Sequence, residues 1–340
     1  MRFTIVTPSY GQLDWLELCI ASVADQGRNR AEAGNLSLSE GQAAAVEGEK
    51  VGTCEGGRRA ETKEIFIEHI VCDGGSEGIG EFKQRMLERL PETPHYRLEF
   101  LIGPDEGMYD AINKGLLRAT GEICAYLNCD EQYLPGTLGW VSDYCSVSPE
   151  TEALFGAAIV TRADGSYVCD RRVMVPTRWH TMVSGNLSIF TSSTFFRRRS
   201  VVERGLLFDP QWRVCGDAVW VLRFLEAGLH MEATHKPLSA FAETGVNMSA
   251  VDNPRAAEES RRLALSAPAA ARALKPAVLL AYRLRRWWSG AYALKPHKYA
   301  VYTAADTRQR SRIDVNEPTF RWQMGTQSAQ HQLAQSVAEV

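Results

Sequence analysis

Short runs of aliphatic and β-branched residues, each ending in a polar turn, alternate with segments of helical periodicity through the first 130 residues. The expected strands are 3–7, 65–75, 97–103 and 123–130, and the expected helices are 14–24, 79–90 and 108–118. This alternation predicts a doubly wound α/β sheet with mainly parallel strands, flanked by helices. Ligands of such sheets bind beyond the carboxyl ends of the strands. The polar turns that follow the strands are therefore the candidate binding edge.

The charge balance excludes one large class of partners. Lysine and arginine number 38 against 41 aspartates and glutamates in 340 residues, a formal net charge of −3. Because no basic excess creates an overall positive field, no nucleic-acid partner is expected. The eight cysteines include no C-x-x-C pair, which argues against a zinc ribbon or a thioredoxin-like motif. With no signal peptide and no apolar run of membrane-spanning length, the expected location is the cytoplasm.

Changes of composition divide the chain into regions. Residues 1–250 are expected to form the α/β domain, and within it 27–63 has almost no large apolar side chains and is expected to be a flexible insertion. Residues 251–310 are rich in alanine and arginine and predict a helical extension, and 311–340 predict a polar tail.

The second half of the α/β domain has two clear local signals. An Ala-Asp-Gly turn between 153–161 and 166–170 predicts a β-hairpin. The amphipathic segment 216–227 predicts a helix, and Gly228 is suited to the residue that ends it.

Acidic side chains gather at the end of one expected strand. Asn128, Asp130 and Glu131 follow an apolar run at the candidate binding edge. Neighbouring carboxylates beside an apolar layer repel one another and lose hydration. A divalent cation relieves both costs, and hard oxygen ligands suit Mg²⁺ or Mn²⁺. The alternative is an acidic turn that only ends the strand.

The segment from residue 103 to 138 contains a long motif. It includes D-E-G-M-Y-D-A-I-N-K-G, then A-T-G, then L-N-C-D-E. In order and spacing this resembles the inverting, nucleotide-sugar-dependent glycosyltransferases of family two, which have the GT-A fold. T-I-V-T-P-S-Y-G-Q at 4–12 and V-C-D-G-G-S-E-G at 71–78 extend the resemblance, which covers about 3–250 apart from the insertion.

The resemblance implies a nucleotide-sugar donor site and a metal site. The implied donor-binding residues are Pro8, Ser9, Tyr10, Asp73, Asp105, Asp110, Lys114 and Asn128. Asp130 is implied as the main metal ligand, with Glu131 beside it and Mg²⁺ or Mn²⁺ as the cofactor. Two departures from the family pattern stand out: Glu131 replaces an aspartate, and Glu77-Gly78 follows Ser76 where the family has threonine and aspartate.

The same resemblance implies a catalytic base. The segment F-D-P-Q-W-R-V-C-G-D-A-V-W-V-L-R-F-L at 208–225 places Asp217 at the start of the expected helix, where the family has its base aspartate. The helix dipole favours a carboxylate there and tends to keep it ionised. The alternative for Asp217 is a simple N-cap. His180 and His235 are candidates for a third metal ligand or a phosphate contact, with structural histidines as the alternative.

The C-terminal segment 270–292 mixes arginines with a tryptophan pair. Arg283, Arg285 and Arg286 lie beside Trp287 and Trp288, a combination suited to an anionic membrane interface. The alternative is an amphipathic helix packed on the α/β domain or on a partner chain, such as a second copy.

The sequence therefore predicts an inverting glycosyltransferase that transfers a sugar from a nucleoside-diphosphate sugar to a saccharide or lipid-linked saccharide, with a role in bacterial surface polysaccharide synthesis. Two alternatives are a nucleotide-sugar-binding relative without transferase activity and a sugar nucleotidyltransferase. The second would need a glycine-rich basic loop after the first strand, which Gly11-Gln12-Leu13-Asp14 does not supply. The absence of G-x-G-x-x-G after that strand and of G-x-x-x-x-G-K-[ST] argues against dinucleotide and P-loop chemistry.

Overall fold

The computed structural model describes residues 1–27, 64–245, 247 and 253–322. The expected insertion at 27–63 lies outside the described residues except for Gly27, and so does 323–340 of the expected tail. Within the described part, the strands are β1 (Arg2–Ser9), β2 (Phe66–Asp73), β3 (Tyr96–Ile102), β4 (Ile123–Tyr126), β5 (Glu131–Tyr133), β6 (Ala153–Arg162), β7 (Tyr167–Arg171), β8 (Thr194–Arg197), β9 (Met231–Glu243), β10 (His297–Thr303) and β11 (Asp306–Val315). The helices are α1 (Leu13–Ala24), α3 (Ile79–Arg89), α4 (Met108–Arg118), α5 (Thr137–Val147), α6 (Arg178–Ser184), α7 (Arg198–Val201), α8 (Gly216–Glu226), α9 (Pro254–Leu265), α10 (Ala269–Ala273) and α11 (Lys275–Trp288).

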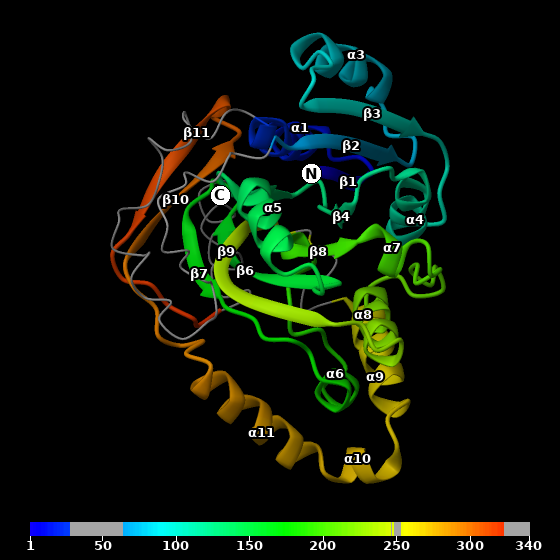
Figure 1. Ribbon diagram of the computed structural model, residues 1–340, viewed down its shortest axis with the longest axis vertical. Helices are drawn as coiled ribbons and strands as arrows, with labels where there is room; N and C mark the ends of the chain where they lie inside the picture. The colour runs from blue at the N-terminus through cyan, green and yellow to red at the C-terminus, as the bar shows by residue number, and fades with distance from the viewer. Residues whose placement is uncertain (28–63, 246, 248–252, 323–340) are drawn as a thin grey trace, which may run out of the picture.

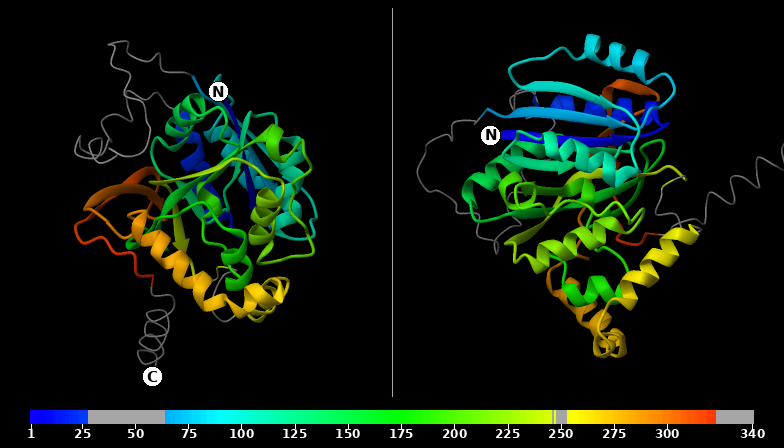
Figure 2. Two further views of the ribbon diagram at one scale, coloured as in Figure 1. Left: turned by 60° about the horizontal axis from the view of Figure 1, so that its bottom comes forward. Right: turned by 90° about the vertical axis from the view of Figure 1, so that its right-hand side faces the viewer.

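A mixed central sheet confirms the predicted fold class. Its order is β3-β2-β1-β4-β8-β6-β9-β5, with β7 paired to β6 (Figure 1). The pairs β3–β2, β2–β1 and β1–β4 are parallel, so the first half of the domain is the predicted doubly wound unit. β8 pairs antiparallel with both β4 and β6, and β9 pairs parallel with β6. Helices flank this curled sheet on both sides (Figure 2).

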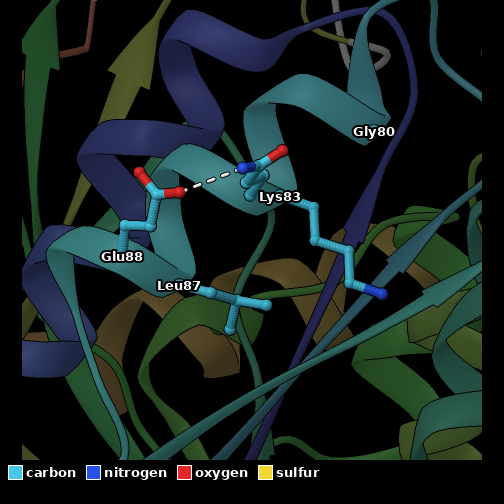
Figure 3. Close-up of a pocket in the computed structure, with 5 residues that line it drawn as sticks. Gly80, Lys83, Leu87 and Glu88 are labelled. Carbon is cyan, nitrogen blue, oxygen red and sulfur yellow. Dashed lines mark hydrogen bonds between the residues drawn. The ribbon is translucent and has the colours of Figure 1, made fainter.

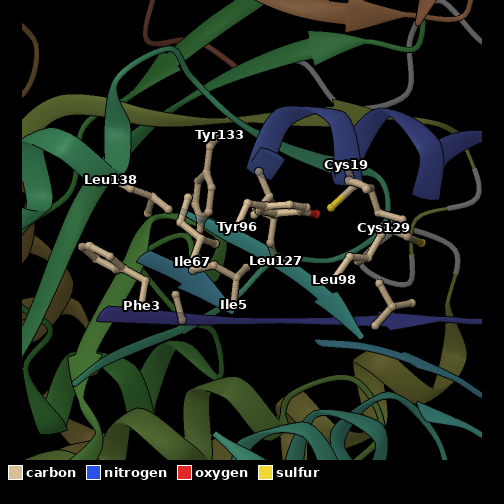
Figure 4. Packing of buried hydrophobic residues seen from close by; sticks show 14 of the residues in the cluster. Phe3, Ile5, Cys19, Ile67, Tyr96, Leu98, Leu127, Cys129, Tyr133 and Leu138 are labelled. Atoms are coloured by element: carbon tan, nitrogen blue, oxygen red, sulfur yellow. The ribbon is translucent and has the colours of Figure 1, made fainter. Parts of the chain in front are cut away.

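Alternate residues of β1 face opposite sides of the sheet. Phe3 and Ile5 belong to one apolar cluster with α1, α3 and α5, part of which is shown in Figure 4. Val6 belongs to a second cluster on the other side, together with α4 and α8. Because both faces of β1 are covered, all of its residues after Arg2 are buried, as expected for a parallel strand inside a sheet.

The structure confirms the hairpin β6–β7 and the helix α8 predicted in the second half of the domain. Gly228 has a φ of 69°, the left-handed conformation that ends a helix most readily at glycine. The strand expected at 123–130 is shorter, because the chain leaves the sheet after Tyr126 and turns between Asn128 and Glu131.

The C-terminal region differs from the expected helical extension at 251–310 and polar tail from 311. Helices α9 to α11 end at Trp288, and residues 297–315 form the antiparallel hairpin β10–β11. Tyr299, Val301 and Val315 point toward Ile159 and Leu134 of the α/β domain. Side chains that face inward at every second residue are typical of a strand. The expectation of a helix up to residue 310 and a polar tail from 311 was therefore wrong for the hairpin at 297–315.

A buried ion pair attaches this hairpin to the domain. The guanidinium of Arg310 donates to both carboxylate oxygens of Asp25, at 2.6 and 2.9 Å. Its Nη1 also donates to the carbonyls of Tyr133 and Ala300. The Arg310 side chain is only 6% exposed, so water cannot replace these bonds.

We expect Arg310→Met to lower the free energy of unfolding by about 3 kcal/mol, because it leaves the Asp25 carboxylate without its charged partner. Urea unfolding followed by circular dichroism measures the change. Lys298→Met is the control on the same hairpin: its ion pair with Asp314 is exposed and should contribute little. Equal effects of the two substitutions would contradict the proposed attachment.

Candidate active site

The turns after β1 and β2 are held together by the Asp73 carboxylate. Its oxygens accept the N–H groups of Gly75 and Ser76 at 2.9 and 2.6 Å, and the Ser76 hydroxyl at 2.8 Å. The Ser76 hydroxyl in turn accepts the N–H of Gly11 at 2.7 Å. Asp73 therefore fixes the shape of this edge of the sheet.

Tyr10, Gly74 and Asp105 meet at this edge. A Cβ atom on Gly74 would lie 2.8 Å from Oδ2 of Asp105 and 3.1 Å from the Tyr10 ring, so the close approach requires glycine. Asp105 is further fixed by the N–H of Gly107, which its Oδ1 accepts at 2.8 Å. The ring of Tyr10 is 73% exposed and available to a ligand.

Two polar atoms of predicted donor-binding residues are buried without a hydrogen-bond partner among the described residues. They are Oγ of Ser9, next to Pro8 at the end of β1, and Oδ1 of Asn128 after β4. Buried polar atoms nearly always have a partner in a native protein, supplied by the chain, water or a ligand. Both atoms lie at strand ends that precede the candidate site.

The first turn of α4 carries a local ion pair. Nζ of Lys114 lies 2.8 Å from Oδ2 of Asp110 and donates to the carbonyl of Pro104 at 2.8 Å. Its bond to Asp110 raises the pKa of Lys114 and lowers the pKa of Asp110. The guanidinium of Arg213 lies over this turn, since a Cβ on Gly107 would come within 2.5 Å of its Nη1. Two cations thus flank the start of α4.

Tyr109 connects this turn to the start of α8. Its buried hydroxyl donates to the carbonyl of Val214 at 2.8 Å and accepts the N–H of Asp217 at 3.2 Å. Its ring stacks on Phe208 with centroids 5.0 Å apart. Gly216 is required beside it, because an added Cβ would lie 2.5 Å from the ring. Segments a hundred residues apart in sequence are therefore in direct contact at the site.

Asp217 lies in the first turn of α8, and Cys215 rather than Asp217 is the N-cap residue. Its Oδ1 accepts the N–H of Ala218 at 2.7 Å. Burial raises the pKa of Asp217 to about 6, and the charge of Glu259 adds to the rise. The helix dipole favours the ionised carboxylate, but loss of hydration has the larger and opposite effect on the pKa of Asp217, which at about 6 still leaves the carboxyl ionised at neutral pH. A carboxyl with this pKa is suited to accept a proton near neutral pH.

Glu259 of α9 positions the loop that leads to Asp217. Its two carboxylate oxygens accept the N–H groups of Arg213, Val214 and Cys215, each at 2.9 Å. Burial alone would raise the pKa of Glu259, but these three bonds outweigh it and hold the pKa below the ordinary value. Glu259 could not be predicted from the sequence, because its backbone N–H partners lie more than 40 residues away and leave no local pattern.

Half-buried Asp130 ends the turn after β4, and buried Glu131 follows it as the first residue of β5. Oε2 of Glu131 accepts the N–H of Asn128 at 2.9 Å, and Oδ2 of Asp130 accepts from the Asn247 amide at 2.9 Å. Burial raises the pKa of both carboxyls, and that of Glu131 reaches about 8 with the charge of Asp130 as the second cause. The two carboxyls are thus held together where ionising both is costly.

Tyr126 is buried at the end of β4. Burial raises its pKa well above the ordinary value, and the charges of Asp217 and, to a smaller extent, Glu131 add to the rise. Its ring packs edge-on against Phe208, with centroids 5.4 Å apart. Tyr126 therefore belongs to the same aromatic cluster as Phe208, on which Tyr109 stacks.

The carboxylates of Asp130 and Glu131 suit a cation whose remaining ligands come from a substrate and water. Among the described residues, no cluster of three or more His, Cys, Asp or Glu side chains could hold a metal ion by itself. Mg²⁺ and Mn²⁺ are commonly held by one or two carboxylates together with phosphate oxygens and water. One oxygen of each carboxyl is already engaged, that of Glu131 by the N–H of Asn128 and that of Asp130 by the Asn247 amide.

The two histidine candidates lie elsewhere. The His180 ring stacks on Tyr282 of α11 with centroids 3.6 Å apart. Burial lowers the pKa of His180 to about 4, with Arg286 as the second cause. Burial also lowers the pKa of His235 to about 4, with Arg172 and Arg286 adding to the effect. Both rings are therefore neutral beside cations, and neither belongs to a metal cluster with Asp130.

A shallow depression runs along one face of α3 and is separate from this site. It is lined by Gly80, Lys83, Gln84, Leu87 and Glu88, and the Gln84 amide donates to Glu88 at 3.0 Å (Figure 3). All of its lining comes from a single helix, and it contains none of the predicted site residues.

Comparison with known proteins supports the fold. No family model and no curated protein matches the chain. The crystal structure of S. aureus TarS 1-349 in complex with UDP-GlcNAc has a TM-score of 0.50 at 14% identity, covering 84% of this chain and 73% of that chain. Mannosyltransferase PcManGT from Pyrobaculum calidifontis, in complex with GDP-Man and Mn²⁺, has a TM-score of 0.46 at 16% identity, covering 85% and 83%. The chain spans 60% of another TarS 1-349 structure and 44% of the longer TarS. The chain therefore has a glycosyltransferase fold.

We expect Glu259→Gln to lower the free energy of unfolding by about 2 kcal/mol, because an NH2 group replaces one of the two accepting oxygens and cannot accept a backbone N–H. Thermal and urea unfolding measure the loss. Glu258→Gln is the control on the same helix, since that side chain is exposed. If the two variants unfold alike, Glu259 does not hold the loop as described.

The raised pKa of Asp217 predicts a pH-dependent cost. The pKa of Asp217 is about 6 in the folded protein and 3.8 ordinarily. The protonated carboxyl therefore makes its full contribution to stability below about pH 4, and this contribution is lost as the pH rises through 6. We expect Asp217→Asn to raise the melting temperature above pH 6 and to leave it unchanged near pH 4. Asp110→Asn should not stabilise at neutral pH, because Lys114 lowers the pKa of that carboxyl. A melting-temperature difference between Asp217→Asn and wild type that is the same at every pH would contradict the assignment.

Proposed function

We propose that this chain is an inverting glycosyltransferase of the family-two type, with a role in bacterial surface polysaccharide synthesis. It would transfer a sugar from a nucleoside-diphosphate sugar to a saccharide or lipid-linked saccharide. The observation that carries the proposal is the contact between Tyr109 and Asp217. It joins the motif that begins α4 to the proposed base at the same edge of the sheet. The likeness to TarS in complex with UDP-GlcNAc supports the same class of donor.

The donor would lie across the ends of β1, β2 and β4. The exposed Tyr10 ring offers an apolar face for a base, next to Gly74 and Asp105. Ser9 and Asn128 have buried polar atoms that lack partners in the described chain. Asp73 would act through the loop shape that it fixes, because its carboxylate oxygens are engaged by that loop.

The cations flanking α4 would receive the negative charge of the leaving group. Arg213 and Lys114 both lie at the turn that starts this helix. Asp110 would remain ionised through its bond to Lys114, and its carboxylate would accept a hydrogen bond from a hydroxyl of the donor sugar. Charges fixed before the reaction stabilise a developing charge without reorganisation.

The proposed reaction is a single displacement with inversion at the anomeric carbon. The acceptor oxygen forms a bond to that carbon, the bond from the carbon to the phosphate oxygen breaks, and the nucleoside diphosphate leaves. The proton of the acceptor hydroxyl passes to the carboxylate of Asp217, whose pKa near 6 leaves it ionised at neutral pH.

Asp130, with Glu131 beside it, would hold Mg²⁺ or Mn²⁺ together with the donor phosphates. A bound cation would supply charge stabilisation for the leaving diphosphate. It would also offset the cost of ionisation that burial imposes on both carboxyls and to which the charge of Asp130 adds at Glu131. The longer side chain of Glu131 bonds back to the N–H of Asn128, which gives it a turn-stabilising role in addition.

We expect Asp217→Asn to lower kcat by about 10²- to 10⁴-fold, the usual loss on removing a general base, while donor affinity is retained.

Asp130→Asn should instead remove the dependence of donor binding on Mn²⁺. Calorimetry with UDP-, GDP-, CDP- and dTDP-sugars, each with and without Mn²⁺, measures donor binding and identifies which nucleotide the protein prefers. Release of nucleoside diphosphate in the presence of saccharide acceptors measures turnover.

Three outcomes separate the proposal from its alternatives. Tight donor binding without transfer or donor hydrolysis in the wild type would favour a binding relative. Formation of nucleotide-sugar from nucleoside triphosphate and sugar phosphate would favour a nucleotidyltransferase. Near-normal turnover of Asp217→Asn would remove it as the base.

A further inference from the structure

Helix α11 has two different apolar faces. Its half-buried side chains, Val278, Leu279, Tyr282 and Arg286, recur at helical spacing and face the rest of the protein. The stack of Tyr282 on His180 of α6 anchors this inner face. The helix runs along the outside of the molecule below α6 (Figure 1).

The outer face of α11 carries a second apolar stripe, which is exposed. Leu280, Leu284, Trp287 and Trp288 are 57, 52, 66 and 81% exposed. Their spacing of four, three and one residues puts them on one side of a helix, about opposite Tyr282 and Arg286. Exposed apolar side chains gathered on one face of a helix commonly mark an interaction site.

Arginines border this outer stripe on both sides. Arg283 and Arg285 precede and follow Leu284, so they lie about 100° to either side of it around the helix axis. Both are exposed, and no described carboxylate forms an ion pair with either of them. Between Glu259 and Asp306 the sequence has nine lysines and arginines and no acidic residue. This positive region contrasts with the net charge of −3 for the whole chain.

We propose that the outer face of α11 binds the surface of an anionic lipid bilayer. An apolar stripe with tryptophans, flanked by arginines, is the pattern of a helix that lies flat in a membrane interface. The same face of a second copy would bring like charges together, whereas anionic headgroups complement them. Among the described residues, no helix is long and apolar enough to cross a membrane, so this contact would be at the surface.

This surface is connected to the proposed acceptor side of the site. Helix α9, whose Glu259 holds the loop before Asp217, continues through α10 into α11 (Figure 2). The proposed membrane-binding helix and the helix that positions the proposed base are therefore parts of one continuous helical segment. This arrangement suits a lipid-linked acceptor, but binding to the bilayer does not depend on sugar transfer.

Vesicle flotation of the full chain tests the proposal. Wild-type protein should float with vesicles of phosphatidylserine and phosphatidylcholine and not with phosphatidylcholine alone. The double substitution Arg283→Ser and Arg285→Ser should weaken binding about thirtyfold, the loss of two charges at an anionic surface. Leu284→Glu with Trp287→Glu should abolish binding. All four side chains are exposed, and the one bond lost is that from Arg285 to the Val175 carbonyl at 3.1 Å, so circular dichroism should show an unchanged fold.

Leu117→Glu is the matched control, since Leu117 is 65% exposed on α4, a different helix. Its vesicle binding should equal that of the wild type. The proposal is overturned if the wild type does not bind anionic vesicles, or if the α11 variants bind as the wild type does. It is also overturned if light scattering shows that Leu284→Glu with Trp287→Glu only dissociates an oligomer, which would make this face a protein interface.

Discussion

The loss of hydration at carboxylates is the constraint on which the candidate site depends. An acidic group at the edge of an apolar sheet must find hydrogen-bond donors or remain costly to ionise. Asp73 finds three donors from the chain, and Glu259 finds three backbone donors and the guanidinium of Arg255. Burial at Asp130, Glu131 and Asp217 is less well compensated and raises their pKa values. The well-compensated carboxylates stabilise loops. The less compensated carboxyls remain available to bind a ligand or a cation, or to accept a proton.

The sequence predicted the elements whose own residues determine them. The helix at 108–118 and the hairpin β6–β7 follow from periodicity and turn chemistry, and their bounds agree with the structure within a residue or two. The strand β10 was missed because the surrounding alanine- and arginine-rich composition suggested a helix. Its strand character depends on packing against Ile159, about 140 residues earlier.

The same distinction separates the parts of the site that were predicted from those that were not. Asp130 and Asp217 were found because local motifs contain them. Arg213 and Glu259 were not, since their positions depend on a tertiary contact between α9 and the loop before α8. The rise in the pKa of Asp217 was not predicted, for a related reason. A dipole can be inferred from a helix start, but burial can be judged only once the neighbouring elements are placed.

Helix α11 shows how a tertiary contact gives meaning to an ambiguous pattern. Apolar residues occur on opposite sides of this helix, so the sequence alone allows either packing against the protein or contact with a membrane. The structure assigns Tyr282 and Val278 to the inner side through α6 and leaves Leu284 and the tryptophans outside. One apolar face of α11 packs against the protein, and the second is exposed and therefore available to bind a partner. The excess of arginine around that face indicates the charge of the partner.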